Sequence, residues 1–208
     1  MTETFDRDFW ERRWSRALRE SAHAVAERPP NAHLLAEVAD LRPGRALDAG
    51  AGHGAESLWL AARGWRVTAV DFSAVALDHA RSTAETLGAE VAERIEWIEG
   101  DLATWTPPPD RYDLVTCLYV HVAGSVPEMV RRLAAGVTIG GTIFLVGHRP
   151  VDSATGAPTP AAGQVQVSVD TALAALDPRR WEIVVAADRR RETSGTGVDA
   201  VVRARRLA

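Results

Sequence analysis

The stretch Asp48-Ala49-Gly50-Ala51-Gly52-His53-Gly54 lies between a short apolar run and a helix-like segment. Glycine at every second position lets a strand turn sharply into a helix while the backbone approaches a ligand closely. The N–H groups at the start of that helix would favour an anionic group of the ligand. Asp71 ends the next apolar run, where a carboxylate can accept hydrogen bonds from ribose hydroxyls. The spacing therefore predicts a strand–helix–strand unit that binds a nucleoside.

Two histidines, His121 and His148, directly follow later strand-like runs. Ligands of parallel α/β sheets bind beyond the carboxyl ends of the strands, so both side chains are expected to face the same crevice. Histidine changes its charge near neutral pH, which makes both residues candidate proton acceptors. The other histidines that we considered, His23, His33 and His79, lie in helix-like segments and are expected on the surface.

A framework of alternating strands and helices must position these groups. Strands are predicted at residues 46–48, 65–70, 95–99, 112–120, 142–146, 181–187 and 198–202. Helices are predicted at residues 5–21, 31–41, 55–63, 73–88, 125–137 and 170–176. The alternation indicates a parallel sheet with right-handed crossovers. The last two strands are separated only by an arginine-rich turn and should pair antiparallel.

The length of 208 residues favours a single domain, residues 1–208. We expect an aromatic N-terminal helix within residues 1–30, acting as a lid or a dimer contact, and a core over residues 31–208. Residues 149–163 are rich in proline and small residues and are expected to form a flexible loop.

The composition, 46% hydrophobic and 25% charged residues, is that of a soluble globular protein. A net charge of −4 gives no support for a nucleic-acid partner, and no apolar run is long enough to span a membrane. The only cysteine, Cys117, excludes an internal disulfide and fits an apolar strand. These features predict a cytoplasmic protein, and a monomer and a homodimer both stay open.

Four motifs in order resemble those of class I S-adenosylmethionine-dependent methyltransferases. They are the glycine stretch, Val70-Asp71-Phe72-Ser73, Gly100-Asp101-Leu102, and the segments 118–122 and 147–148. Dinucleotide folds favour G-x-G-x-x-G, whereas the third glycine arrives one residue early here. The resemblance runs from Asn31 to the end of the chain. It implies an α/β, Rossmann-like fold with a mostly parallel seven-stranded sheet, a C-terminal antiparallel strand pair and helices on both faces.

Within that family, the chain looks like small actinobacterial-type proteins related to tellurite-resistance and thiopurine methyltransferases. The likeness lies in the aromatic N-terminal helix, in Pro30-Asn31 and in the amino-acid sequence of residues 65–73. The chain also resembles the O-methyltransferases of actinobacterial methylmannose polysaccharides.

The resemblance implies that S-adenosyl-L-methionine is the cofactor, and it gives the first motif a role. The backbone of Gly50, Gly52 and Gly54 should face the methionine part. Asp48 should approach the amino group of that part, through water or backbone. Leu118 should lie near the same end of the cofactor.

The same resemblance assigns the adenosine part to the second and third motifs. Asp71 should hold the ribose hydroxyls, and Phe72 should pack on the adenine ring. Asp101 should accept a hydrogen bond from the adenine amino group, with Leu102 beside the ring.

Methyl transfer from a sulfonium is an in-line displacement, so positioning and a base for the acceptor proton matter most. An unactivated hydroxyl needs a base, whereas a thiolate or halide does not. The histidines therefore favour O-methylation of a small polar acceptor such as a sugar, with His148 as the base and His121 and Tyr119 as supporting residues. Glu56 and Asp152 could help to hold a divalent cation such as Mg²⁺, but no ligand spacing supports one.

Two other functions stay open at this point. One is methylation of a thiol, a halide or a tellurium or selenium oxyanion. The other is a regulator that binds the cofactor without chemistry. No pattern in the sequence identifies the molecule that accepts the methyl group.

Overall fold

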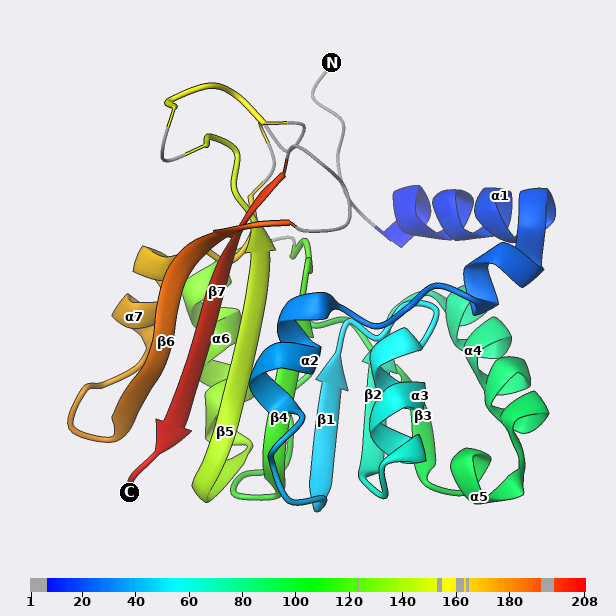
Figure 1. Ribbon diagram of the computed structural model, residues 1–208, viewed down its shortest axis with the longest axis horizontal. Coiled ribbons are helices and arrows are strands. Elements are labelled where there is room, and N and C mark those ends of the chain that lie inside the picture. Colours follow the sequence, from blue (N-terminus) through cyan, green and yellow to red (C-terminus); the bar gives the residue numbers. More distant parts are fainter. Residues whose placement is uncertain (1–6, 123, 153–154, 160–162, 164, 192–196) are drawn as a thin grey trace. The chain divides into compact units, whose positions relative to one another are not determined.

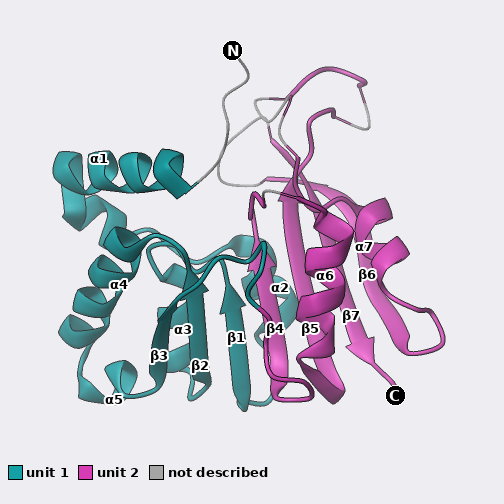
Figure 2. Cartoon of the chain, turned by 180° about the vertical axis from the view of Figure 1, so that it is seen from behind, with its two compact units in different colours: residues 1–105 teal, residues 106–208 magenta. Residues whose placement is uncertain are grey.

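The computed structural model describes residues 7–122, 124–152, 155–159, 163, 165–191 and 197–208. The chain divides into two compact units, residues 1–105 and 106–208, which Figure 2 shows in different colours. Each unit contains one part of the predicted strand set and is described by itself.

The first unit contains three parallel strands in the order β3-β2-β1 (Figure 1). They are β1 (Arg45–Ala49), β2 (Arg66–Asp71) and β3 (Ile95–Glu99). The apolar residues of β1 and β2 are buried almost throughout, as expected of strands covered on both faces. The register pairs Ala49 with Val70 and Asp71 with Glu99, so the strands end at one edge, where Asp71 was predicted to bind ribose.

Five helices accompany these strands in the described residues of the first unit. They are α1 (Arg7–Ala26), α2 (Ala32–Val38), α3 (Ala55–Ala62), α4 (Ala74–Leu87) and the single turn α5 (Ala89–Ala92). Helix α3 packs on β1 and β2, and α4 packs on β2 and β3. The Asn31 and Ser73 side chains cap α2 and α4 by accepting backbone N–H groups, as the sequence predicts.

Helix α1 lies beside α4, and the backbone breaks at Ser21. There the chain is extended (φ −165°, ψ 92°), and the Ser21 hydroxyl accepts a hydrogen bond from the N–H of Ala24 at 3.1 Å. The predicted helix over residues 5–21 is therefore longer at its end, because Ser21 starts a second short helical segment. Its first two predicted residues lie outside the described part of the chain.

The described residues of the second unit contain four strands in the order β4-β5-β7-β6. They are β4 (Tyr112–Leu118), β5 (Val137–His148), β6 (Trp181–Arg190) and β7 (Val198–Arg206). Strands β4 and β5 are parallel, whereas β7 is antiparallel to both β5 and β6, which confirms the predicted C-terminal antiparallel pair. Helix α6 (Val126–Ala135) packs on β5, and α7 (Val169–Ala175) packs on α6, β6 and β7.

Several strand ends differ from the prediction, and those of β4 and β5 have a local cause. Strand β4 ends at Leu118 rather than Val120, because Tyr119 turns into the left-handed region at φ 57°. Strand β5 begins at Val137, so the pair Gly140-Gly141 lies inside the strand and is not a turn before it. The pairing with β4 shifts register at this point, and Gly140 (φ 82°) supplies the conformation of the irregularity.

Gly54 and Gly140 share a left-handed backbone conformation but differ in the space around them, so substitutions at the two positions distinguish the cost of the conformation from the cost of a steric clash. Both have φ near +80°, but a Cβ at Gly54 would lie 2.8 Å from Ala80 and from the Trp97 ring, whereas nothing lies within 4 Å at Gly140. Gly140→Ala should cost about 1–2 kcal/mol for the left-handed backbone alone. Gly54→Ala should cost about 1–3 kcal/mol more because its neighbours must move. Urea unfolding of both variants measures the difference, and equal losses would contradict the contact.

Candidate functional site

The glycine stretch forms the turn from β1 into α3, and all three of its glycines have positive φ: 83° at Gly50, 52° at Gly52 and 83° at Gly54. Asp71, at the end of β2, holds this turn in place. One carboxylate oxygen accepts the N–H of Gly52 at 2.9 Å, and the other accepts the N–H of Ser73 at 2.9 Å. Each oxygen has a second lone pair, so both can also accept a hydroxyl. The predicted nucleoside-binding unit therefore has the expected backbone.

The N–H groups of this turn are donated within the protein. Those of Gly50 and Ala51 go to the Val70 carbonyl at 2.8 and 3.1 Å, and that of Gly54 goes to the Ala51 carbonyl at 2.8 Å. The N–H of Gly52 goes to Asp71. These four N–H groups therefore have acceptors within the protein, whereas the expectation of an anionic ligand group at the start of α3 stays a prediction.

Carboxylates surround the same turn instead. Asp48 is buried and accepts the Ser57 hydroxyl at 2.6 Å, and Glu56, in the first turn of α3, accepts the Asn31 N–H at 2.9 Å. Burial raises the pKa of Glu56 to about 7, and the Asp48 carboxylate adds to that rise. Burial also raises the pKa of Asp71, against the two N–H groups that lower it. Asp48, Glu56 and Asp71 therefore surround the turn with acidic groups, and those that are ionised would favour a positively charged ligand group.

Helix α1 reaches this turn through residues spaced on one helical face. Arg7 donates to the Phe72 carbonyl at 2.9 Å and pairs with Glu99. Glu11 accepts the Ser73 hydroxyl at 3.2 Å and the N–H of Ala74 at 2.9 Å. The helix is therefore tied to the segment that follows β2.

Trp14 lies further along the same face of α1. Its ring lies 3.0 Å from the position that a Cβ of Gly52 would take, and 5.3 Å from the His53 ring between centroids. Burial lowers the pKa of His53 to about 4, and the Arg28 charge adds to this, so His53 is neutral at physiological pH. The aromatic helix thus covers the glycine turn.

The remaining adenosine candidates of the first unit are arranged as follows. Asp101 is exposed, and its Oδ1 accepts the N–H of Ala103 at 2.8 Å in the turn after β3. Leu102 beside it is buried, and Phe72 is half-buried. The surface prediction for the helix-borne histidines is wrong for His33, which is 9% exposed because α2 turns it inward. His23 is exposed and His79 is half-buried.

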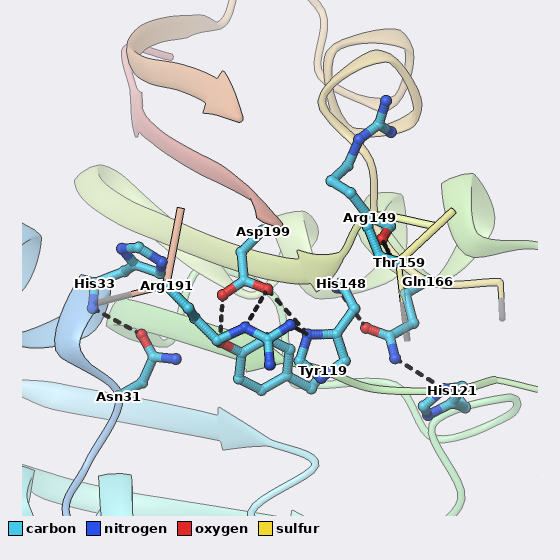
Figure 3. Close-up of polar contacts among 10 residues, drawn as sticks. All are labelled: Asn31, His33, Tyr119, His121, His148, Arg149, Thr159, Gln166, Arg191 and Asp199. Carbon is cyan, nitrogen blue, oxygen red and sulfur yellow. Dashed lines mark hydrogen bonds and ion pairs between the residues drawn. The ribbon is translucent and has the colours of Figure 1, made fainter. Parts of the chain in front are cut away.

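Asp199 is the centre of the second unit's polar network and was missing from the sequence-based set (Figure 3). It is fully buried at the start of β7. Its Oδ1 lies 2.9 Å from His148 Nδ1 and accepts Arg191 Nε at 3.1 Å, and its Oδ2 accepts the Tyr119 hydroxyl at 2.8 Å. The structure therefore brings two of the predicted catalytic residues together on one unpredicted carboxylate.

Tyr119 and His148 also contact each other directly. Their rings stack with centroids 3.9 Å apart and planes inclined by 25°. This contact and the bond to Asp199 hold Tyr119 in its left-handed conformation, which a side chain of this size rarely adopts. Leu118, predicted to lie near the methionine end of the cofactor, ends β4 just before this turn and is half-buried.

Gln166 joins the two predicted histidines (Figure 3). Its Oε1 accepts the backbone N–H of His148 at 2.8 Å, and its Nε2 lies 2.8 Å from His121 Nε2. Gln166 is buried, and its neighbour Val167 abuts β5 so closely that a Cβ at Gly147 would lie 2.1 Å from the Val167 carbonyl oxygen. No sequence motif marks Gln166, whereas Asp199 had one usable signal: the antiparallel pairing aligns it with His148.

A metal site is not apparent. Nowhere in the described ranges do three or more His, Cys, Asp or Glu side chains gather as a metal ion would require. Glu56 is hydrogen-bonded to Asn31, and Asp152 pairs with Arg190 at 3.3 Å in the part of residues 149–163 that is described.

None of the helices in the described residues has the length and apolar character needed to cross a membrane. Cys117 is buried, as predicted.

A family model described as a methyltransferase domain matches residues 46–141, which include the glycine turn, Asp71, Asp101 and His121. The matched segment runs from β1 into β5. No curated protein sequence matches the chain.

Solved structures extend the likeness over most of the chain. The geranyl diphosphate C-methyltransferase of Streptomyces coelicolor A3(2), solved with Mg²⁺, geranyl diphosphate and S-adenosyl-L-homocysteine, is 15% identical over 95% of this chain and 83% of its own, with a TM-score of 0.66. An S-adenosylmethionine-dependent methyltransferase from Mesorhizobium loti is 20% identical over 78% and 90%, with a TM-score of 0.60. The [4+2]-cyclase SpnF is 18% identical over 94% and 84%, with a TM-score of 0.64.

These matches confirm the predicted Rossmann-like methyltransferase fold. The predictions of a methyltransferase and of S-adenosyl-L-methionine as its cofactor agree with them. The likeness includes a C-methyltransferase and a cyclase, so the fold does not select the acceptor atom.

The raised pKa of Glu56 predicts a pH-dependent stability. The folded state keeps a proton on Glu56 up to about pH 7, whereas the unfolded chain releases it near 4.5. Stability from this group is thus present below pH 4.5 and is lost as the pH rises through 7. Glu56→Gln keeps an acceptor for Asn31 and should gain up to about 3 kcal/mol on the wild type between about pH 5 and 8, at about 1.4 kcal/mol per pKa unit.

Urea unfolding of both proteins at the two pH values measures this gain. His53 acts with the opposite sign between about 4 and 6.5, but it is common to both proteins and cancels in the difference. The same difference at both pH values would show that Glu56 titrates normally.

Proposed function

We propose that the chain is an S-adenosyl-L-methionine-dependent methyltransferase that methylates a hydroxyl of a small polar molecule, with His148 as the base. The cofactor carries a methyl group on a positively charged sulfur, so a new O–C bond forms as the C–S bond breaks and its electron pair stays on sulfur. The acceptor oxygen loses its proton to His148, which later releases it to water. A sugar, and within sugars a methylmannoside, is the acceptor class that we favour.

The observation that carries the cofactor assignment is the acidic character of the glycine turn. The N–H groups of Gly50, Gly52 and Gly54 are spent within the protein, so the turn offers little to a pyrophosphate. Asp48 and Glu56 instead suit the ammonium group and sulfonium of the cofactor. Two arginines near the turn have partners of their own: Arg7 pairs with Glu99, and Arg28 lies over the Trp14 ring.

The remaining cofactor contacts follow the predicted roles. We assign the ribose hydroxyls to the second lone pairs of Asp71, and the adenine amino group to Asp101. We assign apolar contact with the ring to Phe72 and Leu102, and we keep for Leu118 the role that the resemblance implies. S-adenosyl-L-homocysteine in the related C-methyltransferase supports a cofactor of this class.

The histidine network supports an acceptor that must lose a proton. A histidine held by a buried carboxylate is the usual arrangement of a general base. Sulfur, halide and tellurium or selenium oxyanion acceptors arrive already nucleophilic and need no such group. They remain the alternative, together with a regulator that binds the cofactor but transfers nothing.

Asp71→Asn should weaken cofactor binding by about 10- to 100-fold. An amide group would face the N–H of Gly52 or Ser73, and hydrogen bonds to a charged group contribute about 1.5–3 kcal/mol. Isothermal titration with S-adenosyl-L-methionine and S-adenosyl-L-homocysteine measures the loss, with exposed Asp78→Asn as the matched control. A wild-type protein that binds neither compound would refute the proposed cofactor.

His148→Ala should lower turnover by about 10²- to 10⁴-fold, the usual contribution of a general base, while cofactor affinity stays unchanged. Turnover is followed as S-adenosyl-L-homocysteine release with a panel of sugars, thiols and halides. His23→Ala, at an exposed position of α1, is the control. Unchanged turnover in His148→Ala would favour the alternative acceptors, and binding without turnover on any acceptor would favour the regulator.

A further inference from the structure

The structure separates the two histidines by the hydrogen bonds that use their ring nitrogens. We infer that Asp199 and Gln166 are positioning residues that leave His148 Nε2 as the proton acceptor and fix His121 as a neutral ring that cannot serve as the base. This inference rests on the proposed function for its catalytic part, whereas the assignment of protons rests on hydrogen-bond geometry alone.

The contact with Asp199 determines which ring nitrogen of His148 carries the proton. The fully buried carboxylate lies 2.9 Å from His148 Nδ1, and two lone pairs cannot face each other at that distance without a proton between them. Arg191, with its permanent charge, donates to the same oxygen, so Asp199 is ionised and the proton resides on Nδ1. A guanidinium nitrogen of Arg191 also lies 3.1 Å from Nδ1, but donation to Nδ1 would leave the Asp199 contact without its proton. Neutral His148 therefore carries its lone pair on Nε2.

The contact with Gln166 determines which ring nitrogen of His121 carries the proton. The backbone N–H of His148 can only donate, so the Gln166 atom that faces it must be the carbonyl oxygen. The Gln166 amide nitrogen then faces His121 Nε2 at 2.8 Å and donates to it. His121 Nε2 is therefore an acceptor, and the ring proton resides on Nδ1, which is buried.

A second proton on His121 has no acceptable place. It would have to sit on Nε2, where it would meet the Gln166 NH₂ group. Turning the Gln166 amide over would place that group against the N–H of His148 instead. Gln166 thus occupies the Nε2 lone pair of His121, while Asp199 leaves the lone pair of His148 on Nε2.

Tyr119 completes the arrangement. Its hydroxyl donates to Asp199 Oδ2, and its ring stacks on the imidazole of His148. The phenol proton is therefore committed to Asp199, and Tyr119 fixes the plane of His148. Its role in the reaction is thus to orient the base.

Two-bond ¹H–¹⁵N correlation spectra of the full, unliganded chain test the proton assignments at an alkaline pH. The signals of the six histidines are assigned with single His→Gln variants. Both His121 and His148 should be Nδ1–H tautomers, although the Nε2–H form predominates for free histidine in water. An Nε2–H signal from either residue overturns the inference, whether or not the chain is a methyltransferase.

Gln166→Glu and Asp199→Asn distinguish the two positioning residues. Glutamate keeps an acceptor for the His148 N–H but loses the donor to His121, so His121 alone should change to a form with a proton on Nε2. Asparagine offers a single oxygen to the three groups that Asp199 serves, so His148 alone should lose its Nδ1–H preference. Urea unfolding and cofactor titration verify that each variant is folded. A change at neither histidine, or at the wrong one, overturns the inference.

Turnover then tests the catalytic part. Asp199→Asn should lower kcat by about 10²-fold or more at constant cofactor affinity, as expected when a general base is lost. Tyr119→Phe, which removes one donor but keeps the stacked ring, should have a smaller effect. Asp199→Asn with altered tautomer but full kcat overturns the catalytic role. A wild-type protein without any turnover refutes the proposed function and this role together, while the spectra still decide where the protons lie.

Discussion

In each unit, one carboxylate near the end of a strand and largely removed from water holds the surrounding polar groups in place. It is Asp71 in the first unit and Asp199 in the second. A buried carboxylate is costly unless donors replace the lost water. Asp71 recruits backbone N–H groups from the glycine turn and from the start of α4, and Asp199 recruits Tyr119, His148 and Arg191. In each unit, one charge therefore determines the conformation of segments that are distant in the sequence.

The electrostatic character of the glycine turn distinguishes it from a phosphate-binding loop. Positive φ at three alternate glycines folds the turn so tightly that its amides find acceptors in β2 and in the turn itself. Acids then dominate the surroundings, and the proton held by Glu56 moderates their repulsion. Such a site suits a cation with an apolar body, and Trp14 of α1 supplies an apolar cover.

The sequence predicted the backbone of the first unit well because its signals are local. Alternate glycines, cap residues such as Ser73, and Asp71 at the end of a buried strand each depend on a few neighbouring residues. The ends of β4 and β5 were harder. Tyr119 adopts a left-handed conformation that its type disfavours, and Gly140-Gly141, a turn signal in isolation, is absorbed into an irregular strand. In both places tertiary contacts override local preference.

The residues missed at the second unit's site depend on pairing over long separations. Asp199 faces His148 only because β7 runs antiparallel beside β5 in one register, and a shift of one residue would turn Asp199 to the other side of the sheet. Gln166 lies outside the helices and strands, where no periodic pattern marks a functional side chain. His148 and Tyr119 could be named from the sequence, but the register that brings Asp199 to His148 and the position of Gln166 could not.

Gly147 gives the second unit a constraint that no side-chain hydrogen bond reveals. Because the carbonyl of Val167 occupies the space of a Cβ at Gly147, β5 and the segment before α7 are in backbone-to-backbone contact one residue away from both His148 and Gln166. A side chain at Gly147 would push these two segments apart and so disturb the bonds of the Gln166 amide to the His148 backbone N–H and to the His121 ring. The hydrogen bonds around Gln166 thus depend on a residue that has no side chain. Among natural relatives of this chain, Gly147 should therefore be replaced less often than the residues around it.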